Sequence, residues 1–339
     1  MRNSALFLLL GSYNPPFRVI RMALLFDLAS ERSTEQHLCM RRVALLALIV
    51  AGSTGVSAQT PTPPGTDIYL TRLVRSGGRL TIGAVRNITR RVGYDNQPAF
   101  SLDNRTLYYT SNRGDGQSDI WKVDLTSYRH SQVTRTPESE YSAAVTPDKR
   151  ALSVVRVERD STQRLWRFPL GGGRPCLVID KVKPVGYYAW ANDSIVAMFV
   201  LGRPATLQVG NIDALRVDTI ASSIGRSLHR IPSSSRISFV DKTDSTQWWV
   251  RSLDPATLQH TQLAPLPPAV EDYAWTPRGE LITSDGKGTI MVWQPNAAQP
   301  NYAIWHAIGG LDSTVAGKVT RLAVSPNGTW LAIVAEPAR

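Results

Sequence analysis

Residues whose side chains could bind or transform a polar ligand recur at matching places along this sequence of 339 residues. Each lies three to five residues before an apolar or aromatic residue that recurs at regular intervals. Paired carboxylates can orient a polar ligand, Tyr and Arg are common anchors of binding interfaces, and a compact titratable cluster can catalyse proton transfer. The spacing therefore predicts one site, although its acids come with no base that has an evident orienting partner. The predicted members are Asp95, Glu140, Tyr141, Tyr187, Arg226, Glu271, Asp272 and Arg321.

The sequence lacks the residue patterns that serine hydrolysis, zinc binding and nucleic-acid binding require. A serine hydrolase of the α/β-hydrolase class needs a G-x-S-x-G elbow, and residues 59–339 contain none. Their four histidines lie more than five residues apart, and Cys176 is the only cysteine in this range. Clustered His and Cys ligands are what a zinc site requires, so we predict no metal and no cofactor. The charge of +11 comes from scattered arginines rather than basic runs, which argues against a nucleic-acid partner.

The elements that must position the site form a repeat. Its clearest copy, residues 96–125, has an apolar strand ending at Phe100, a turn at 101–104, a second strand at 106–110 and a third at 119–125. Residues equivalent to Phe100 recur 41 to 49 residues apart, and Pro, Asp, Asn and Gly follow most of them, as turns require. These anchors are Phe100, Val145, Trp190, Ile231, Trp275 and Val324.

Units of this length with about four short strands are typical of propeller blades. We therefore predict an all-β fold, a six-bladed β-propeller over residues 66–339. An orphan strand-like segment at 67–70 resembles the third strand of the clearest repeat, at 119–122. We expect residues 66–89 to supply the outer strands of the last blade, whose inner strands follow Val319, so that the ring has no open junction.

The clearest repeat resembles the WD40-like Pro-Asp (PD40) repeat of TolB-like propellers. Leu102 and Asn104 depart from its Pro and Gly, and the middle blades match it poorly. The resemblance implies a propeller and an envelope location. TolB proteins also carry an α/β domain before the propeller, which this sequence does not show, so their role with the Tol–Pal system does not transfer. The matching residues are Pro98, Phe100, Ser101, Asp103, Leu107, Tyr109, Ser111, Asn112 and Arg113.

The first 65 residues are expected to lie outside the propeller. A positive start at Met40, an apolar run at 43–51 and a small-residue exit at Ala58 are typical of a secretory signal peptide over 40–58. Residues 1–39 are then an over-called extension, and 59–65 a Pro-rich linker. The apolar run is too short to span a bilayer, so we expect a mature chain without a transmembrane segment, either periplasmic or secreted.

These features predict an exported, monomeric, non-catalytic propeller that acts as a scaffold in the cell envelope. The expected partner is an envelope protein or a small polar or glycan ligand. The alternative is an exported propeller enzyme that acts on polysaccharide as a lyase or hydrolase.

Overall fold

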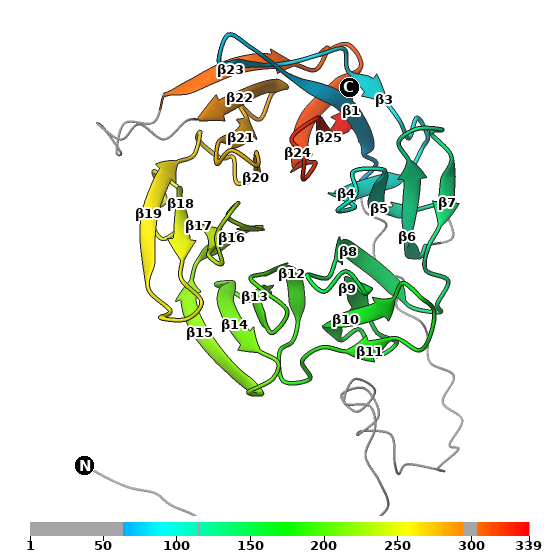
Figure 1. Cartoon of the computed structure of the whole chain (residues 1–339), viewed down its shortest axis with the longest axis vertical. Helices are drawn as coiled ribbons and strands as arrows, with labels where there is room; N and C mark the ends of the chain where they lie inside the picture. The colour runs from blue at the N-terminus through cyan, green and yellow to red at the C-terminus, as the bar shows by residue number, and fades with distance from the viewer. Residues whose placement is uncertain (1–63, 114–115, 294–303, 339) are drawn as a thin grey trace, which may run out of the picture. The chain divides into compact units, whose positions relative to one another are not determined.

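The computed structural model describes residues 64–113, 116–293 and 304–338. In these ranges the chain forms 25 β-strands grouped in six sheets, and the sheets stand around a common centre (Figure 1). The predicted six-bladed β-propeller is therefore confirmed. None of the described residues belongs to a helix long and apolar enough to cross a bilayer. The predicted extension 1–39, the signal peptide 40–58 and residues 59–63 lie outside the described residues.

The first three blades each use four consecutive antiparallel strands. Blade 1 contains β4 (Tyr94–Phe100), β5 (Thr106–Asn112), β6 (Ser118–Asp124) and β7 (His130–Gln132). Blade 2 contains β8 (Ser139–Val145), β9 (Ala151–Val157), β10 (Gln163–Pro169) and β11 (Cys176–Leu177). Blade 3 contains β12 (Val185–Trp190), β13 (Ile195–Val200), β14 (Thr206–Asn211) and β15 (Arg216–Ser222).

The next two blades repeat this order, and the last is composite. Blade 4 contains β16 (Ile224–Arg230), β17 (Ile237–Asp241), β18 (Trp249–Leu253) and β19 (His260–Pro265). Blade 5 contains β20 (Tyr273–Trp275), β21 (Leu281–Ser284), β22 (Thr289–Trp293) and β23 (Trp305–Gly310). Blade 6 joins β24 (Ala316–Val324) and β25 (Trp330–Pro337) to β1 (Asp67–Ser76), β2 (Arg79–Ile82) and β3 (Arg86–Asn87).

The ring closes through the pairing of β1 with β25. The two strands are antiparallel over six residue pairs, from Asp67 opposite Ala335 to Arg72 opposite Trp330. The amino-terminal strands therefore form the outer half of blade 6, as the orphan strand at 67–70 predicted. The pairing gives β25 a partner strand on its outer edge, so that no long sheet edge of β25 is left at the junction.

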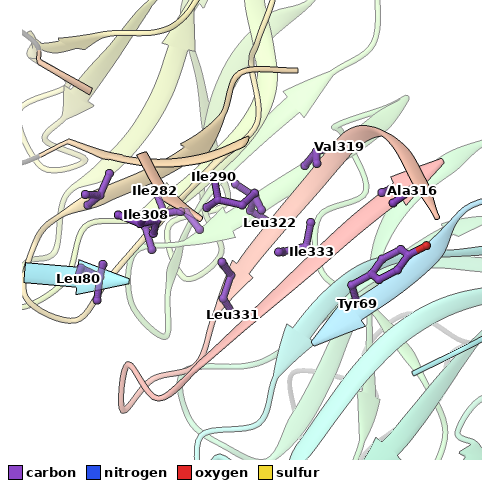
Figure 2. Packing of buried hydrophobic residues seen from close by; sticks show 13 residues of the cluster. Tyr69, Leu80, Ile282, Ile290, Ile308, Ala316, Val319, Leu322, Leu331 and Ile333 are labelled. Carbon is purple, nitrogen blue, oxygen red and sulfur yellow. The ribbon is translucent and has the colours of Figure 1, made fainter. Parts of the chain in front are cut away.

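Six clusters of buried hydrophobic side chains hold the described blades together, one at each junction between neighbours. Successive residues of a strand point to opposite faces of its sheet, so every blade contributes to two clusters. In β1, Tyr69 packs toward blade 5, whereas Ile68 and Leu70 pack toward blade 1. Figure 2 shows the first of these clusters, in which Leu331 and Ile333 of blade 6 meet Ile282 and its neighbours from blade 5.

The turns between the first and second strands use the predicted polar chemistry. The hydroxyl of Ser101 donates to Asp103 at 2.5 Å and accepts a backbone N–H from across the turn. Asn104 then adopts a φ of 62°, in the left-handed region that Asn tolerates. The same arrangement recurs in the turns at 146–149 and 325–328.

A second repeated contact joins neighbouring blades. The tripeptide Tyr-Ala-Trp occurs at 188–190 and at 273–275, each time at an inner strand. The indole N–H of Trp190 donates to the buried hydroxyl of Ser153 at 2.9 Å, and that of Trp275 donates to Ser238 at 2.8 Å. Both anchors predicted at these positions therefore hold a blade to the preceding one. The anchor predicted at Ile231 lies one residue beyond β16.

Replacing Ile68 with Ala is expected to lower the free energy of unfolding by about 2–5 kcal/mol, since it removes a fully buried side chain from the closing strand. Val74, on the same strand, is 44% exposed, and Val74→Ala is expected to change stability by less than about 0.5 kcal/mol. Denaturant titration of both variants measures the difference. Equal effects would contradict the view that the closing strand anchors the ring.

Candidate functional site

Each of the six blades contributes one polar or aromatic residue, from its inner strand or, for Asp272, from the position just before it. These strands, β4, β8, β12, β16, β20 and β24, lie nearest the centre of the ring (Figure 1). These residues lie close enough to influence the pKa of Tyr94 or Arg321, although they are spread over more than 220 positions of sequence. We call them the axial cluster. Its members are Tyr94, Tyr141, Tyr187, Arg226, Asp272 and Arg321.

The core of the axial cluster is a carboxylate shared by two guanidinium groups. Asp272 Oδ1 accepts from Arg321 Nη1 at 2.8 Å, and Oδ2 accepts from Arg226 Nη2 at 2.6 Å. The other Arg321 nitrogen, Nη2, donates to the hydroxyl of Tyr187 at 2.7 Å. Both arginines also donate to the backbone oxygen of Thr320, at 3.0 and 3.1 Å. This network connects four consecutive blades, 3 to 6.

Glu271 extends the network on one side. Its carboxylate lies 3.4 Å from Arg226 Nε and 3.3 Å from Lys242 Nζ, and it also accepts the backbone N–H of Arg226. The approach is close because Gly225 has no side chain: a Cβ atom there would lie 2.8 Å from Glu271 Oε2. The Lys242 ammonium in turn sits 3.8 Å from the centroid of the Trp248 ring.

Burial and nearby charges determine the protonation states of Arg321 and Tyr94. Burial favours the neutral form of Arg321, but Asp272 and Tyr187 outweigh it and raise the pKa of the guanidinium above its ordinary value. Burial raises the pKa of Tyr94 as well, assisted by Tyr187, so this phenol stays protonated at neutral pH. The cluster therefore contains a charged Arg321 guanidinium beside the Asp272 carboxylate and a neutral Tyr94 hydroxyl.

A histidine lies close to the same network. The ring of His229, on β16, packs against Tyr273 with 4.8 Å between centroids. Burial lowers the pKa of His229 to about 4, although the nearby Asp272 opposes the shift. The imidazole is consequently neutral at pH 7. The blade spacing predicts this position, because His229 lies two residues before the anchor Ile231, and it predicts outer-strand or inter-blade segments for the other three, His130, His260 and His306. The structure has these three on outer strands.

Five of the eight residues predicted for the site form one network: Tyr187, Arg226, Glu271, Asp272 and Arg321. Tyr141 joins them through its electrostatic interaction with Tyr94, and it also packs at the junction of blades 2 and 3.

Asp95 and Glu140 are placed differently, because both are fully buried. Asp95 accepts from Arg91 at 2.8 Å and from Ser111 at 2.6 Å. Glu140 bonds to Thr136 and lies 3.4 Å from Arg156 Nε. Each is next in sequence to a tyrosine of the axial cluster, and adjacent residues on a strand face opposite ways.

Tyr94 is the member that the sequence did not reveal. The prediction took residues three to five positions before each anchor, whereas Tyr94 lies six positions before Phe100. The β-bulges of the first two inner strands do not cause this difference, because they lie at corresponding places. One bulge lies between Asn96 and Ala99 in blade 1, and another lies between Tyr141 and Ala144 in blade 2. Strand pairing would not have found it either, because Tyr141 pairs with Val155, and the corresponding partner in β5, Thr110, lies opposite Asn96 rather than Tyr94.

Metal ligands do not cluster in the part of the chain that the structure describes. No group of three or more His, Cys, Asp or Glu side chains there could hold a metal ion.

Comparisons with known proteins show the fold. No protein-family model matches the chain, and no curated protein sequence matches it. A structure described as a TolB from Agrobacterium tumefaciens superimposes with a TM-score of 0.60 at 14% identity, covering 80% of this chain and 98% of that one. A gluconolactonase from Xanthomonas campestris gives 0.54 at 12% identity, covering 81% and 99%. An oligogalacturonate lyase in complex with manganese gives 0.51 at 16% identity, covering 75% and 80%. The chain is thus a TolB-like propeller in its architecture, and this architecture also carries enzymes.

Replacing Asp272 with Asn is expected to cost about 3 kcal/mol of unfolding free energy, because it removes the anion of the largely buried Arg321 guanidinium and one of the two carboxylates that contact Arg226. The control is Asp218→Asn. Asp218 pairs with Arg216, whose side chain is 67% exposed, so that change should cost at most about 1 kcal/mol. Denaturant titration of both variants at 0.1 M and 1 M salt measures the costs. A loss no larger than that of the control would mean that the shared carboxylate does not hold the cluster together.

Glu140 predicts a dependence of stability on pH. Burial raises the pKa of its carboxyl group from 4.5 to about 7, against the opposing effect of Thr136 and Arg156. The folded state therefore retains a proton that the unfolded chain releases. This contribution to stability is complete below about pH 4.5 and is lost as the pH rises through 7, by up to about 3 kcal/mol.

Glu140→Gln should flatten this slope between pH 5 and pH 8 and should raise stability at pH 8. The control, Glu158→Gln, should leave that range unchanged, because Arg164 holds the pKa of Glu158 below its ordinary value. Thermal unfolding across the pH range distinguishes the variants. An unchanged slope in Glu140→Gln would show that another group controls it.

Proposed function

We propose that this chain is an exported, non-catalytic propeller that binds a polar partner at the axial cluster and acts as a scaffold in the cell envelope. One observation carries the proposal, namely the network that joins Tyr187, Arg226, Asp272 and Arg321 across four blades. Such a network fixes the side chains before a partner arrives, so little conformational entropy is lost when the partner binds.

The chemistry of the cluster indicates what the partner offers. Guanidinium groups and phenols donate hydrogen bonds to oxygen, and they are common anchors in interfaces. The arginines and Lys242 slightly outnumber the acids Asp272 and Glu271 that they contact. A partner with carbonyl or carboxylate oxygens fits this surface, such as an extended segment of an envelope protein or a polar glycan. The envelope location rests on the predicted signal peptide and is supported by the likeness to a TolB structure.

One observation favours the alternative, an exported enzyme that acts on polysaccharide. His229 is neutral at pH 7 and lies near the Asp272–Arg321 pair, so a base, an acid and a cation stand close together. In a lyase, a cation neutralises the sugar carboxylate while a base removes a proton from the neighbouring carbon. An imidazole with a pKa of about 4 is a weak base at pH 7, and this favours binding over catalysis.

Affinity capture from solubilised envelope with residues 59–339 identifies the partner, and titration with the purified partner tests the site. Tyr187→Phe removes one hydroxyl and should weaken binding about tenfold, while Arg321→Met should weaken it further. Arg278 is exposed, and Arg278→Gln should leave the affinity unchanged.

The alternative is tested with the same preparations, by adding a polyuronate and recording the absorbance of the unsaturated product. Turnover that His229→Gln abolishes would establish the enzyme and overturn the scaffold. A captured partner that binds equally to the wild type, Tyr187→Phe and Arg321→Met would place the binding surface outside the axial cluster.

A further inference from the structure

A second polar cavity lies at the rim of the propeller, where the closing blade meets blade 1. It has a volume of about 220 Å³ and shares no residue with the axial cluster. One wall comes from the segment around β3 and the other from the start of β7, which are outer strands of neighbouring sheets (Figure 1). The lining residues are Arg86, Asn87, Ile88, Arg90, Tyr128 and His130.

A stacking contact positions the side chain of Arg86, and a turn fixes the backbone at Arg90. The guanidinium carbon of Arg86 lies 4.0 Å from the centroid of the Tyr128 ring, so stacking fixes one face and leaves the N–H edge for other partners. Arg90 follows a turn in which Asn87 Oδ1 accepts the backbone N–H groups of Thr89 and Arg90, at 3.1 and 2.9 Å. Its φ of 44° is unusual for a residue other than glycine.

The charge of the rim cavity is positive. Among the described residues no carboxylate lines it. Asp67 contacts Asn87 from outside the lining and is bonded to the side chains of Asn87 and Thr89, at 2.8 and 3.0 Å. His130 contributes no charge at neutral pH, because burial and the nearby Arg113 lower its pKa. Two guanidinium groups therefore face this small space without an acid beside them.

The repeat offers an internal comparison. The turn at 124–130 recurs at 254–260. In both copies the backbone carbonyl of an aspartate accepts the N–H of the residue four positions on, Tyr128 or Leu258, which has a positive φ. In both copies the outer strand then begins with a histidine. The groove beside the second copy, between blades 3 and 4, has a volume of about 420 Å³. It contains no arginine, and its lining residues are Asp218, Thr219, Ile220, Leu258, Gln259 and His260. A basic lining is thus no general property of the grooves between blades.

We propose that the rim cavity binds a phosphate group, either as the free ion or as the monoester of a small sugar. Guanidinium groups offer paired N–H donors that match the oxygens of a phosphate, and charged hydrogen bonds of this kind are short and strong. The cavity is smaller than the roughly 300 Å³ at which pockets for larger ligands begin. Its two walls come from blade 6 and blade 1, so an occupant links residues 86–90 to blade 1.

Calorimetric titration of residues 59–339 with inorganic phosphate, at constant ionic strength, tests the proposal. The wild type should bind phosphate, and Arg86→Gln/Arg90→Gln should bind it at least about tenfold more weakly, because two charged hydrogen-bond donors are lost. Arg174→Gln/Arg278→Gln is the matched control. It removes the same charge from exposed positions outside the cavity and should change the affinity less than about twofold.

Parallel titrations with glucose 6-phosphate and glucose distinguish the two sources of phosphate. Tighter binding of the ester than of the free ion indicates a sugar phosphate, and the reverse order indicates the ion. Hydrogen exchange should show greater protection at 86–90 and 128–132 when phosphate is bound, in the wild type alone. Absence of binding to the wild type would overturn the proposal. So would phosphate binding that Arg321→Met abolishes and Arg86→Gln/Arg90→Gln retains, because the ion would then occupy the axial cluster.

Discussion

Every blade of this protein has two apolar faces, and the structure follows from the need to bury both. Successive residues of one strand enter different clusters, as Ile68 and Tyr69 do in β1 and as Tyr108 and Tyr109 do in β5. A stack of such sheets with free ends would expose one face at each end, whereas a ring has no ends. The amino-terminal strand meets this constraint by pairing with β25, so that blade 6 can bury one face against blade 5 and the other against blade 1.

Closure of the ring also positions the residues of the axial cluster. Arg321 lies on β24, whose partner β25 is held in turn by β1. The ion pair between Arg321 and Asp272 therefore joins the composite blade to blade 5, and the hydrogen bond from Arg321 to Tyr187 crosses to blade 3. An axial cluster drawn from six blades requires six inner strands at fixed positions. The same apolar clusters that close the ring thus give the polar cluster its rigidity.

Prediction from the sequence succeeds for the repeating part of this structure and is less accurate where the repeat is broken. The six blades, the closing strand and the turn at 101–104 follow from residue types with one dominant preference, such as apolar alternation and Asn in a left-handed turn. The site depends on register, and β-bulges change the register of the inner strands by amounts that residue types do not encode. Tyr94 is missed for a further reason: it lies two residues beyond the position that corresponds to Tyr141, so a comparison of the blades points to Asn96 instead. The rim cavity could not be predicted, because it joins segments of two different sheets whose packing against each other the residue types do not encode.

Departures from the repeat are therefore the better guide to function. The shared features, which are the Ser-Asp turns, the Trp–Ser contacts and the six apolar clusters, are satisfied within the protein and need no partner. Near the centre of the ring, by contrast, the inner strands and the residue before β20 carry tyrosine, arginine or aspartate, and these differences produce one asymmetric network. At the rim, two grooves beside equivalent turns also differ from each other, since arginines line one and an aspartate lines the other. A fold that needs only alternating apolar residues leaves these positions free to vary, so the residues found there report on what the protein binds.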